Sequence, residues 1–169
     1  MKAFVVLGMH RSATSLVAQG LARSGVHMGD RLLGQSPDQP LGHWEDADFV
    51  RLNDDILSLA GGSWDDPPPE ENIEAIAEGN REFFAEWIER KERELWGWKD
   101  PRTVLTIPCF APHLRGEHYI VVRRDPMEVA ESLLRRNGMP VSTGVVLAKE
   151  YERRLRKFME GQWRRWTSR

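Results

Sequence analysis

The feature that most constrains the fold of this chain is a short apolar run that leads directly into a polar turn and then into a helical pattern. Residues 3–7 read Ala-Phe-Val-Val-Leu, which is long enough for one buried strand. Apolar residues then recur at helical spacing from Leu16 until Gly25, a residue type that often ends helices. A turn between a strand and a helix N-terminus directs several backbone N–H groups to one spot, where the helix dipole adds positive potential. This segment therefore predicts a site for a phosphate or a sulfate group.

The turn itself, residues 8–15, differs from the G-x-x-x-x-G-K-[ST] loop of nucleotide triphosphatases. Gly8 fits the first glycine and Ser15 fits the hydroxyl position, but Ala13 and Thr14 stand at the second glycine and at the lysine. The missing lysine is the group that reaches the β- and γ-phosphates of a nucleotide. We therefore expect the turn to bind one terminal phosphate rather than ATP with Mg²⁺.

Two interpretations of the polar side chains in this turn are open. In the first, His10 and Arg11 are donors to a bound anion in place of the missing lysine. In the second, the segment is an ordinary strand, turn and helix, and Ser12 or Thr14 caps the helix without binding a ligand.

A second segment combines a strand candidate, residues 117–122, with charged and hydroxyl residues that follow it. Asp125 fits the N-cap and Pro126 the first position of the next helix. Arg124 lies at the end of the strand and Ser132 lies two turns along that helix. The sequence therefore predicts that Arg124 and Ser132 bind a second phosphate.

A third strand candidate covers residues 95–98 and ends in the sequence Lys-Asp-Pro-Arg, residues 99–102. A fourth strand is expected near residues 26–28 or in residues 103–107. Strands that alternate with helices imply a parallel sheet, and ligands bind at the carboxyl ends of such strands. The predicted fold is α/β, a three-layer α/β/α arrangement around a central parallel sheet like that of P-loop nucleotide-binding proteins.

Taken in order along the chain, these segments resemble the PAPS-dependent sulfotransferase superfamily, where PAPS is 3′-phosphoadenosine 5′-phosphosulfate. Residues 10–15 resemble the loop that binds the 5′-phosphosulfate in this family, R-S-G-T-[ST], with Ala13 in place of the glycine. Arg124 and Ser132 match the 3′-phosphate pair of the family in residue type and in spacing. The resemblance covers roughly residues 1–136.

Two shorter segments add to the resemblance. Residues 99–101 match the K-D-P element of tyrosylprotein-type and many bacterial sulfotransferases, and residues 42–46 resemble the segment with the acceptor-activating glutamate. The resemblance implies that Glu45 takes a proton from the acceptor, while Lys99 and Arg11 stabilise the leaving phosphate. It implies a cofactor site built from His10, Arg11, Ser12, Ala13, Thr14, Ser15, Arg124 and Ser132.

The implied reaction is the transfer of a sulfuryl group from PAPS to a hydroxyl or amine of a small-molecule or glycan acceptor, which leaves PAP, adenosine 3′,5′-bisphosphate. It parallels phosphoryl transfer, in which positioning and charge stabilisation provide most of the catalysis. A sulfuryl group carries less charge than a terminal phosphoryl group, so no metal is expected. If Glu45 only interacts with a helix dipole, Asp100 and His43 are the remaining candidate bases.

Two other functions stay open. One is a P-loop nucleotide kinase or NTPase, against which Thr14 argues. The other is a non-catalytic module that binds PAP or another nucleotide, consistent with Ala13. Sulfotransferases often complete the cofactor site with a C-terminal basic, glycine-containing segment, and no clear equivalent follows residue 136. The C-terminal arginines, a partner subunit in a homodimer, or nothing would fill that role.

Composition limits the remaining classes. A chain of 169 residues is expected to form a single domain, residues 1–169, with a sizeable core. Its net charge of −2 provides no basic field for nucleic acid or for an anionic membrane. The single cysteine, Cys109, excludes an intramolecular disulfide. No apolar run approaches the roughly 18 residues of a membrane span, so we expect a cytoplasmic protein.

Helical patterns are expected at residues 46–59, 70–94 and 141–166. Residues 65–94 carry eleven acidic and four basic residues, whereas residues 149–169 carry eight basic and three acidic residues. Both charge runs are interpreted either as solvated helix faces or, for the basic run, as a surface that attracts an anionic acceptor or the 3′-phosphate of the cofactor.

Overall fold

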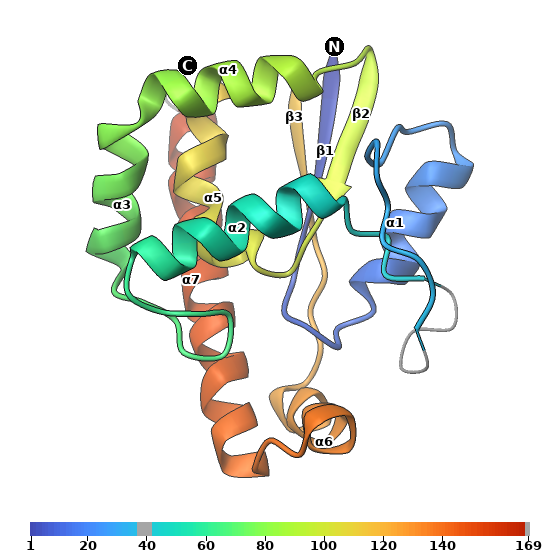
Figure 1. The fold of residues 1–169 in the computed structure, drawn as a ribbon, viewed down its shortest axis with the longest axis vertical. Helices are drawn as coiled ribbons and strands as arrows, with labels where there is room; N and C mark the ends of the chain where they lie inside the picture. The colour runs from blue at the N-terminus through green and yellow to red at the C-terminus, as the bar shows by residue number, and fades with distance from the viewer. Residues whose placement is uncertain (37–41, 168–169) are drawn as a thin grey trace.

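The computed structural model describes residues 1–36 and 42–167, and Figure 1 shows how their elements are arranged. In chain order the elements are β1 (Lys2–Leu7), α1 (Thr14–Arg23), α2 (Ala47–Leu59), α3 (Glu70–Gly79), α4 (Arg81–Lys91), β2 (Leu95–Lys99), α5 (Thr103–Phe110), the 3-10 helix η1 (Ala111–His113), β3 (Glu117–Val121), α6 (Pro126–Asn137) and α7 (Val141–Thr167).

The three strands form one parallel sheet in the order β2-β1-β3. Val5 at the centre of β1 pairs with Trp98 on β2 and with Tyr119 on β3. Parallel strands need long crossover connections. Helices α1 to α4 lie in the connection from β1 to β2, and α5 lies in the connection from β2 to β3. The three predicted strands are confirmed, and the chain is an α/β protein with a central parallel sheet.

Side chains of β1 alternate between two apolar clusters because successive strand residues point to opposite faces of a sheet. Val6 packs with Ala18 of α1 in the smaller cluster. Val5 and Leu7 belong to the larger cluster, together with Phe49 of α2 and residues of α5 and α7. Figure 1 shows α1 on one side of the sheet and both α5 and α7 on the other. Helices therefore cover both faces of the sheet.

The predicted helix over residues 70–94 is wrong in length, because the structure divides it into α3 and α4. The break falls at Gly79 and Asn80, two residues with low helix propensity. Asn80 ends α3 with its own side chain, whose Nδ2 donates to the Ile76 carbonyl oxygen at 2.9 Å. The apolar residues on either side of the break, Ile73 and Phe84, both reach the large core cluster.

The fourth strand is also wrong for the described part of the chain. Residues 103–107 lie in α5, a helix that is buried along nearly its whole length. A short, uniformly apolar run does not distinguish a buried strand from a buried helix. Asp100 fixes the start of this helix, since its carboxylate accepts from the Arg102 N–H at 3.0 Å. In residues 26–28 only His27 joins the sheet, through a single bridge to Trp96.

The two long predicted helices at residues 46–59 and 141–166 are confirmed as α2 and α7. The acidic and basic runs partly face each other where α3 meets α7. Glu70 accepts from Arg153 at 2.5 Å and from Lys157 at 2.8 Å. These contacts favour a structural role for this part of both charge runs. No helix in the described residues is long and apolar enough to cross a membrane.

Candidate anion-binding site

The turn after β1 leads into α1 without a side-chain cap. Gly8 is required there because a Cβ atom would lie 2.6 Å from the Val122 carbonyl oxygen and 2.8 Å from Cγ2 of Thr14. Ala13 is the N-cap residue, and no described side chain caps the helix. The interpretation in which Ser12 or Thr14 caps α1 is therefore wrong. The first turn of α1 offers its N–H groups and the positive end of the dipole to an anion.

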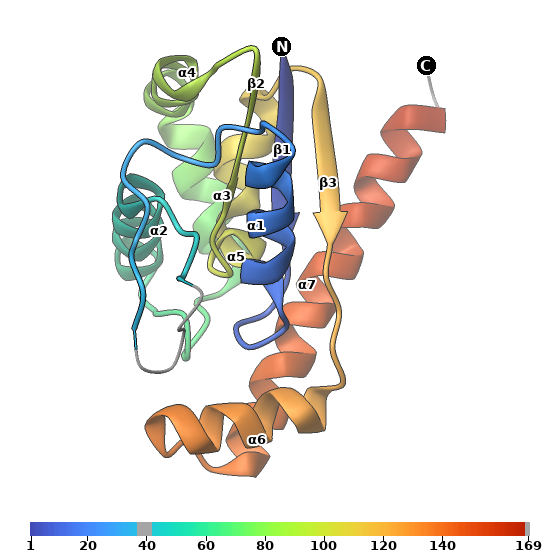
Figure 2. The ribbon, with the colours of Figure 1, turned by 90° about the vertical axis from the view of Figure 1, so that its right-hand side faces the viewer.

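Arg11 connects this turn to α6. Its Nε donates to Ser132 Oγ at 2.9 Å, and Arg124 donates through a terminal guanidinium nitrogen to the Arg11 carbonyl oxygen at 2.8 Å. Arg124 also donates through Nε to Glu128 at 2.9 Å. Both residues that the sequence predicts for a second phosphate thus contact the turn, although they come from the far end of the chain. Figure 2 shows that the strands point toward the end of the molecule where α6 lies.

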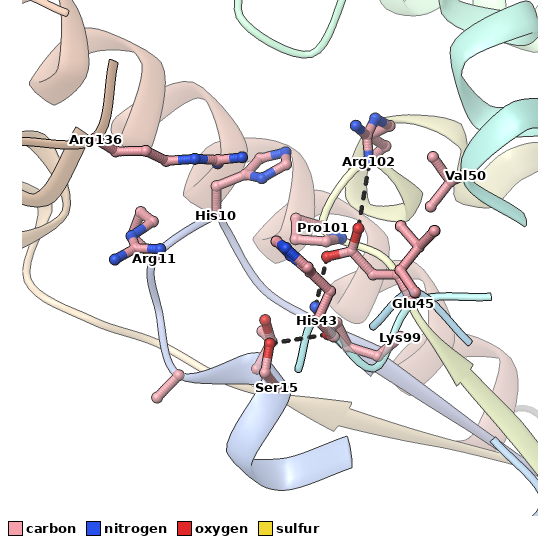
Figure 3. Close-up of a pocket in the computed structure, with 13 residues that line it drawn as sticks. His10, Arg11, Ser15, His43, Glu45, Val50, Lys99, Pro101, Arg102 and Arg136 are labelled. Atoms are coloured by element: carbon pink, nitrogen blue, oxygen red, sulfur yellow. Dashed lines mark hydrogen bonds and ion pairs between the residues drawn. The ribbon is translucent and has the colours of Figure 1, made fainter. Parts of the chain in front are cut away.

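A cavity of about 160 Å³ lies beside this turn, and Figure 3 shows its lining residues. The turn after β1, the approach to α2, the end of β2 and the end of α6 each contribute to it. Its polar lining is mostly cationic, with one carboxylate. The lining residues are His10, Arg11, Ala13, Thr14, Ser15, Leu33, His43, Glu45, Val50, Lys99, Pro101, Arg102 and Arg136.

Lys99 and Glu45 form an ion pair inside this cavity, with Nζ 2.6 Å from Oε1. Lys99 is 2% exposed and Glu45 is 8% exposed. Lys99 ends β2, and Glu45 immediately precedes Asp46, the N-cap residue of α2. Asp46 holds this approach in place, since its carboxylate accepts from the N–H groups of Asp48 and Asp30 at 2.7 Å each. The structure therefore brings together two of the predicted catalytic residues, the cation Lys99 and the candidate base Glu45.

Arg102 lies behind Glu45 and is held by three carboxylates. Its guanidinium is 2.6 Å from Asp54, 3.0 Å from Asp100 and 3.7 Å from Glu45. Burial lowers the pKa of Arg102, but the charges of Asp100, Asp54 and Glu45 outweigh it and raise that pKa above its usual value. Arg102 therefore stays charged, and it fixes one side of Glu45. Asp100, one of the two remaining candidate bases, is thus held by Arg102.

A buried polar network between α2 and the start of α5 holds Asp100, the partner of Arg102, in place. Asn53 of α2 donates from Nδ2 to Asp100 at 2.8 Å and to Thr103 at 3.2 Å, and it accepts from Thr106 at 2.6 Å. Trp98 of β2 donates to Thr103 at 3.1 Å. Sequence reasoning missed Asn53, because its partners lie 47 to 53 positions away and no local motif marks it.

His10 occupies the inner wall of the cavity and is only 6% exposed. Its ring lies 4.5 Å from the Trp64 ring and 6.3 Å from the Tyr151 ring, measured between centroids. Burial, followed by the charges of Arg102, Arg136, Lys99 and Arg11, holds the pKa of His10 well below its usual value. The sequence predicts His10 as a donor to an anion, and the neutral imidazole favoured here has one ring N–H for that role.

The remaining predicted residues are divided between structural and lining roles. Ser15 donates its hydroxyl to the His43 carbonyl oxygen at 3.0 Å, which joins α1 to the approach to α2. His43 lies within 2.8 Å of Ser36 Oγ through its Nε2. Arg136 lines the cavity and was missed. It follows Ser132 by one helical turn, and this i, i+4 spacing is the signal that places it on the same face of α6.

A second cavity of about 260 Å³ lies on the other side of the turn, between α6 and α7. Ser12 and Arg124 line it together with apolar side chains such as Val129 and Leu155. The turn after β1 is thus bordered by a small cationic cavity and by a larger, more apolar one. Comparison of the chain with protein-family models, with curated proteins and with solved structures found no match.

Proposed function

We propose that this chain is a PAPS-dependent sulfotransferase, which transfers a sulfuryl group to a hydroxyl or amine of a small-molecule or glycan acceptor. The observation that supports this proposal best is the contact of Lys99 with Glu45 in a cavity bordered by the uncapped N-terminus of α1. In such a cavity the Lys99 cation would stabilise a leaving phosphate, and the Glu45 carboxylate would take the proton of the acceptor.

The residues present fit a donor with two anionic ends. Gly8 lets the turn lie directly against Val122, where a Cβ atom would clash, and His10 Nε2 is buried without a hydrogen-bond partner among the described residues. The small cavity lies below the about 300–1,000 Å³ of pockets that enclose whole drug-sized ligands, so only one end of a nucleotide would enter it. Arg11, Lys99 and the first N–H groups of α1 would hold the 5′-phosphosulfate, and Arg124 with Ser132 would hold the 3′-phosphate.

When bound, PAPS would supply the sulfuryl group and a phosphate leaving group. Lys99 and the N–H groups at the start of α1 stabilise negative charge at one position of the cavity, the kind of fixed electrostatic arrangement that lowers barriers of group transfer. Glu45 accepts the proton of the acceptor, and Arg102 keeps its carboxylate in place. Leu33, Val50 and Pro101 provide an apolar wall beside Glu45, which limits access of water.

Calorimetric titration with PAP, and separately with ATP and Mg²⁺, tests the proposal. We expect PAP to bind without metal. Arg124→Ala should weaken PAP binding about tenfold or more, because a hydrogen bond to a charged group contributes about 1.5–3 kcal/mol. Arg123→Ala is the matched control, since Arg123 is the neighbouring arginine and its guanidinium pairs with Glu152 of α7 at 3.2 Å. That variant should bind PAP within about twofold of the wild type.

Three results would contradict the proposal. A preference for ATP with Mg²⁺ over PAP would favour a kinase or NTPase. Equal loss of PAP affinity in Arg124→Ala and Arg123→Ala would show that Arg124 acts through general charge and not at a 3′-phosphate site. If PAP binds as expected but no acceptor yields PAP from PAPS, the chain is a non-catalytic PAP-binding module.

A further inference from the structure

His10 is the one buried titratable side chain of the cavity to which the proposed transfer assigns no step. Its ring packs against the rings of Trp64 and Tyr151. Nε2 is buried and has no hydrogen-bond partner among the described residues. Buried polar atoms without a partner are rare and costly in folded proteins. A ligand that can accept a hydrogen bond at this position would remove that cost.

Cations surround this imidazole from four elements of the fold. Arg11 comes from the turn after β1, Lys99 from the end of β2, Arg102 from the start of α5 and Arg136 from the end of α6. The other groups that face His10 are Tyr151 of α7 and, across the cavity, the Glu45 carboxylate. Burial and the four positive charges lower the pKa of His10, so the neutral form of the ring is favoured beside these cations.

We propose that His10 takes up a proton from solution when a sulfate or phosphate oxyanion enters this cavity, so that the oxyanion binds more tightly as the pH falls. The inference rests on the anion site of the proposed function. Arriving negative charge offsets the four cations that oppose protonation of the ring, and it attracts the proton directly. The protonated ring donates from both nitrogens, which gives the buried Nε2 a role as a donor to the oxyanion.

Linkage fixes the sign of the effect. If the bound oxyanion raises the affinity of His10 for a proton, protonation of His10 raises the affinity for the oxyanion by the same factor. The neutral form of His10 still allows binding through Arg11, Lys99 and the start of α1. When the pH falls below the pKa of His10 in the complex, the ring becomes protonated and its second nitrogen becomes a further donor to the oxyanion.

The test is an NMR titration of the histidine ring carbons in the full chain from about pH 8 down to about pH 4, because burial holds the pKa of His10 well below its usual value. The titration is run in sodium sulfate and, at matched ionic strength, in sodium chloride. Sulfate is the probe because its own charge does not change over this range. The titration midpoint of His10 should move upward in sulfate by about one unit, which corresponds to tenfold tighter binding of sulfate to the protonated form.

His10→Gln assigns the signal, and if that variant does not fold, replacement of each of the other four histidines assigns it by elimination. His27 is the internal control, since it pairs with Asp30 at 2.9 Å outside the cavity and its signal should not respond to sulfate. An equal His10 midpoint in sulfate and in chloride would overturn the inference. If His10 responds to sulfate but PAP does not bind, the proposed function fails alone. If PAP binds but His10 does not respond, this inference fails alone.

Discussion

Two residues of the turn after β1 adopt a backbone conformation that their side chains disfavour. Arg11 has a φ of 65° and Ala13 a φ of 63°, both in the left-handed region. For a residue with a Cβ atom this region costs roughly 1–2 kcal/mol. Arg11 is held by Ser132 and Arg124. Ala13 is exposed, and it stands at the position where the resemblance has glycine.

Ala13→Gly should therefore raise the free energy of unfolding by about 0.5–1 kcal/mol, because glycine adopts positive φ without steric cost. The net gain is smaller than the strain itself, since glycine also makes the unfolded chain more flexible. Urea denaturation followed by circular dichroism measures the change.

Ala75→Gly is the matched control for this substitution. Ala75 is an exposed residue in the middle of α3, with ordinary helical backbone. The same change should there lower the free energy of unfolding by about 1 kcal/mol. A lower free energy of unfolding in both variants would contradict the claim that the backbone at Ala13 is strained.

At the scale of elements, one buried polar network fixes α2 against the start of α5. Asn53 is fully buried and bridges Asp100, Thr103 and Thr106. Asn53 holds Asp100, Asp100 pairs with Arg102, and Arg102 in turn contacts Glu45. A polar network of this kind stabilises a protein only when every member has its partner.

Asn53→Ala should lower the free energy of unfolding by about 3 kcal/mol, because it leaves the buried Asp100 oxygen and the Thr106 hydroxyl with fewer partners. Thermal and urea denaturation measure the loss. Asn72→Ala is the control, since Asn72 is exposed and its side chain donates to the Ala60 carbonyl oxygen at 2.9 Å. It should cost about 1 kcal/mol or less. Similar losses in the two variants would contradict the importance of the network.

Element patterns in the sequence predict some features well and others poorly, for physical reasons. The three strands are short apolar runs bounded by polar residues, so periodicity finds them. Asp125 caps α6 as the sequence predicts, and Asp46 caps α2 by the same side-chain chemistry. The strand expected in residues 103–107 is a helix instead, because a helix that is buried on all sides is as uniformly apolar as a buried strand. The break at Asn80 lies within an otherwise continuous helical pattern, where tertiary packing decides the direction of the chain.

At the scale of the whole molecule, the candidate site is assembled from segments that are distant in sequence. The strand-turn-helix pattern predicts the loop at residues 12–15, and the resemblance implies the roles of Lys99 and Glu45. Motifs do not predict that Arg136 lines the same cavity or that Asn53 supports it. Those contacts depend on how α6 and α2 pack, which no spacing within one element determines. The lowered pKa of His10 likewise depends on its burial and on cations from four elements.

The measurement that tests the central claim most directly is a crystal structure of the chain with PAP. The account predicts that the 5′-phosphate contacts the backbone N–H groups of residues 12–15 and Lys99. It also predicts that the 3′-phosphate contacts Arg124 and Ser132. A 5′-phosphate bound elsewhere, for example in the cavity between α3, α5 and α7 beside Arg154, would contradict the assignment of the site and the function derived from it.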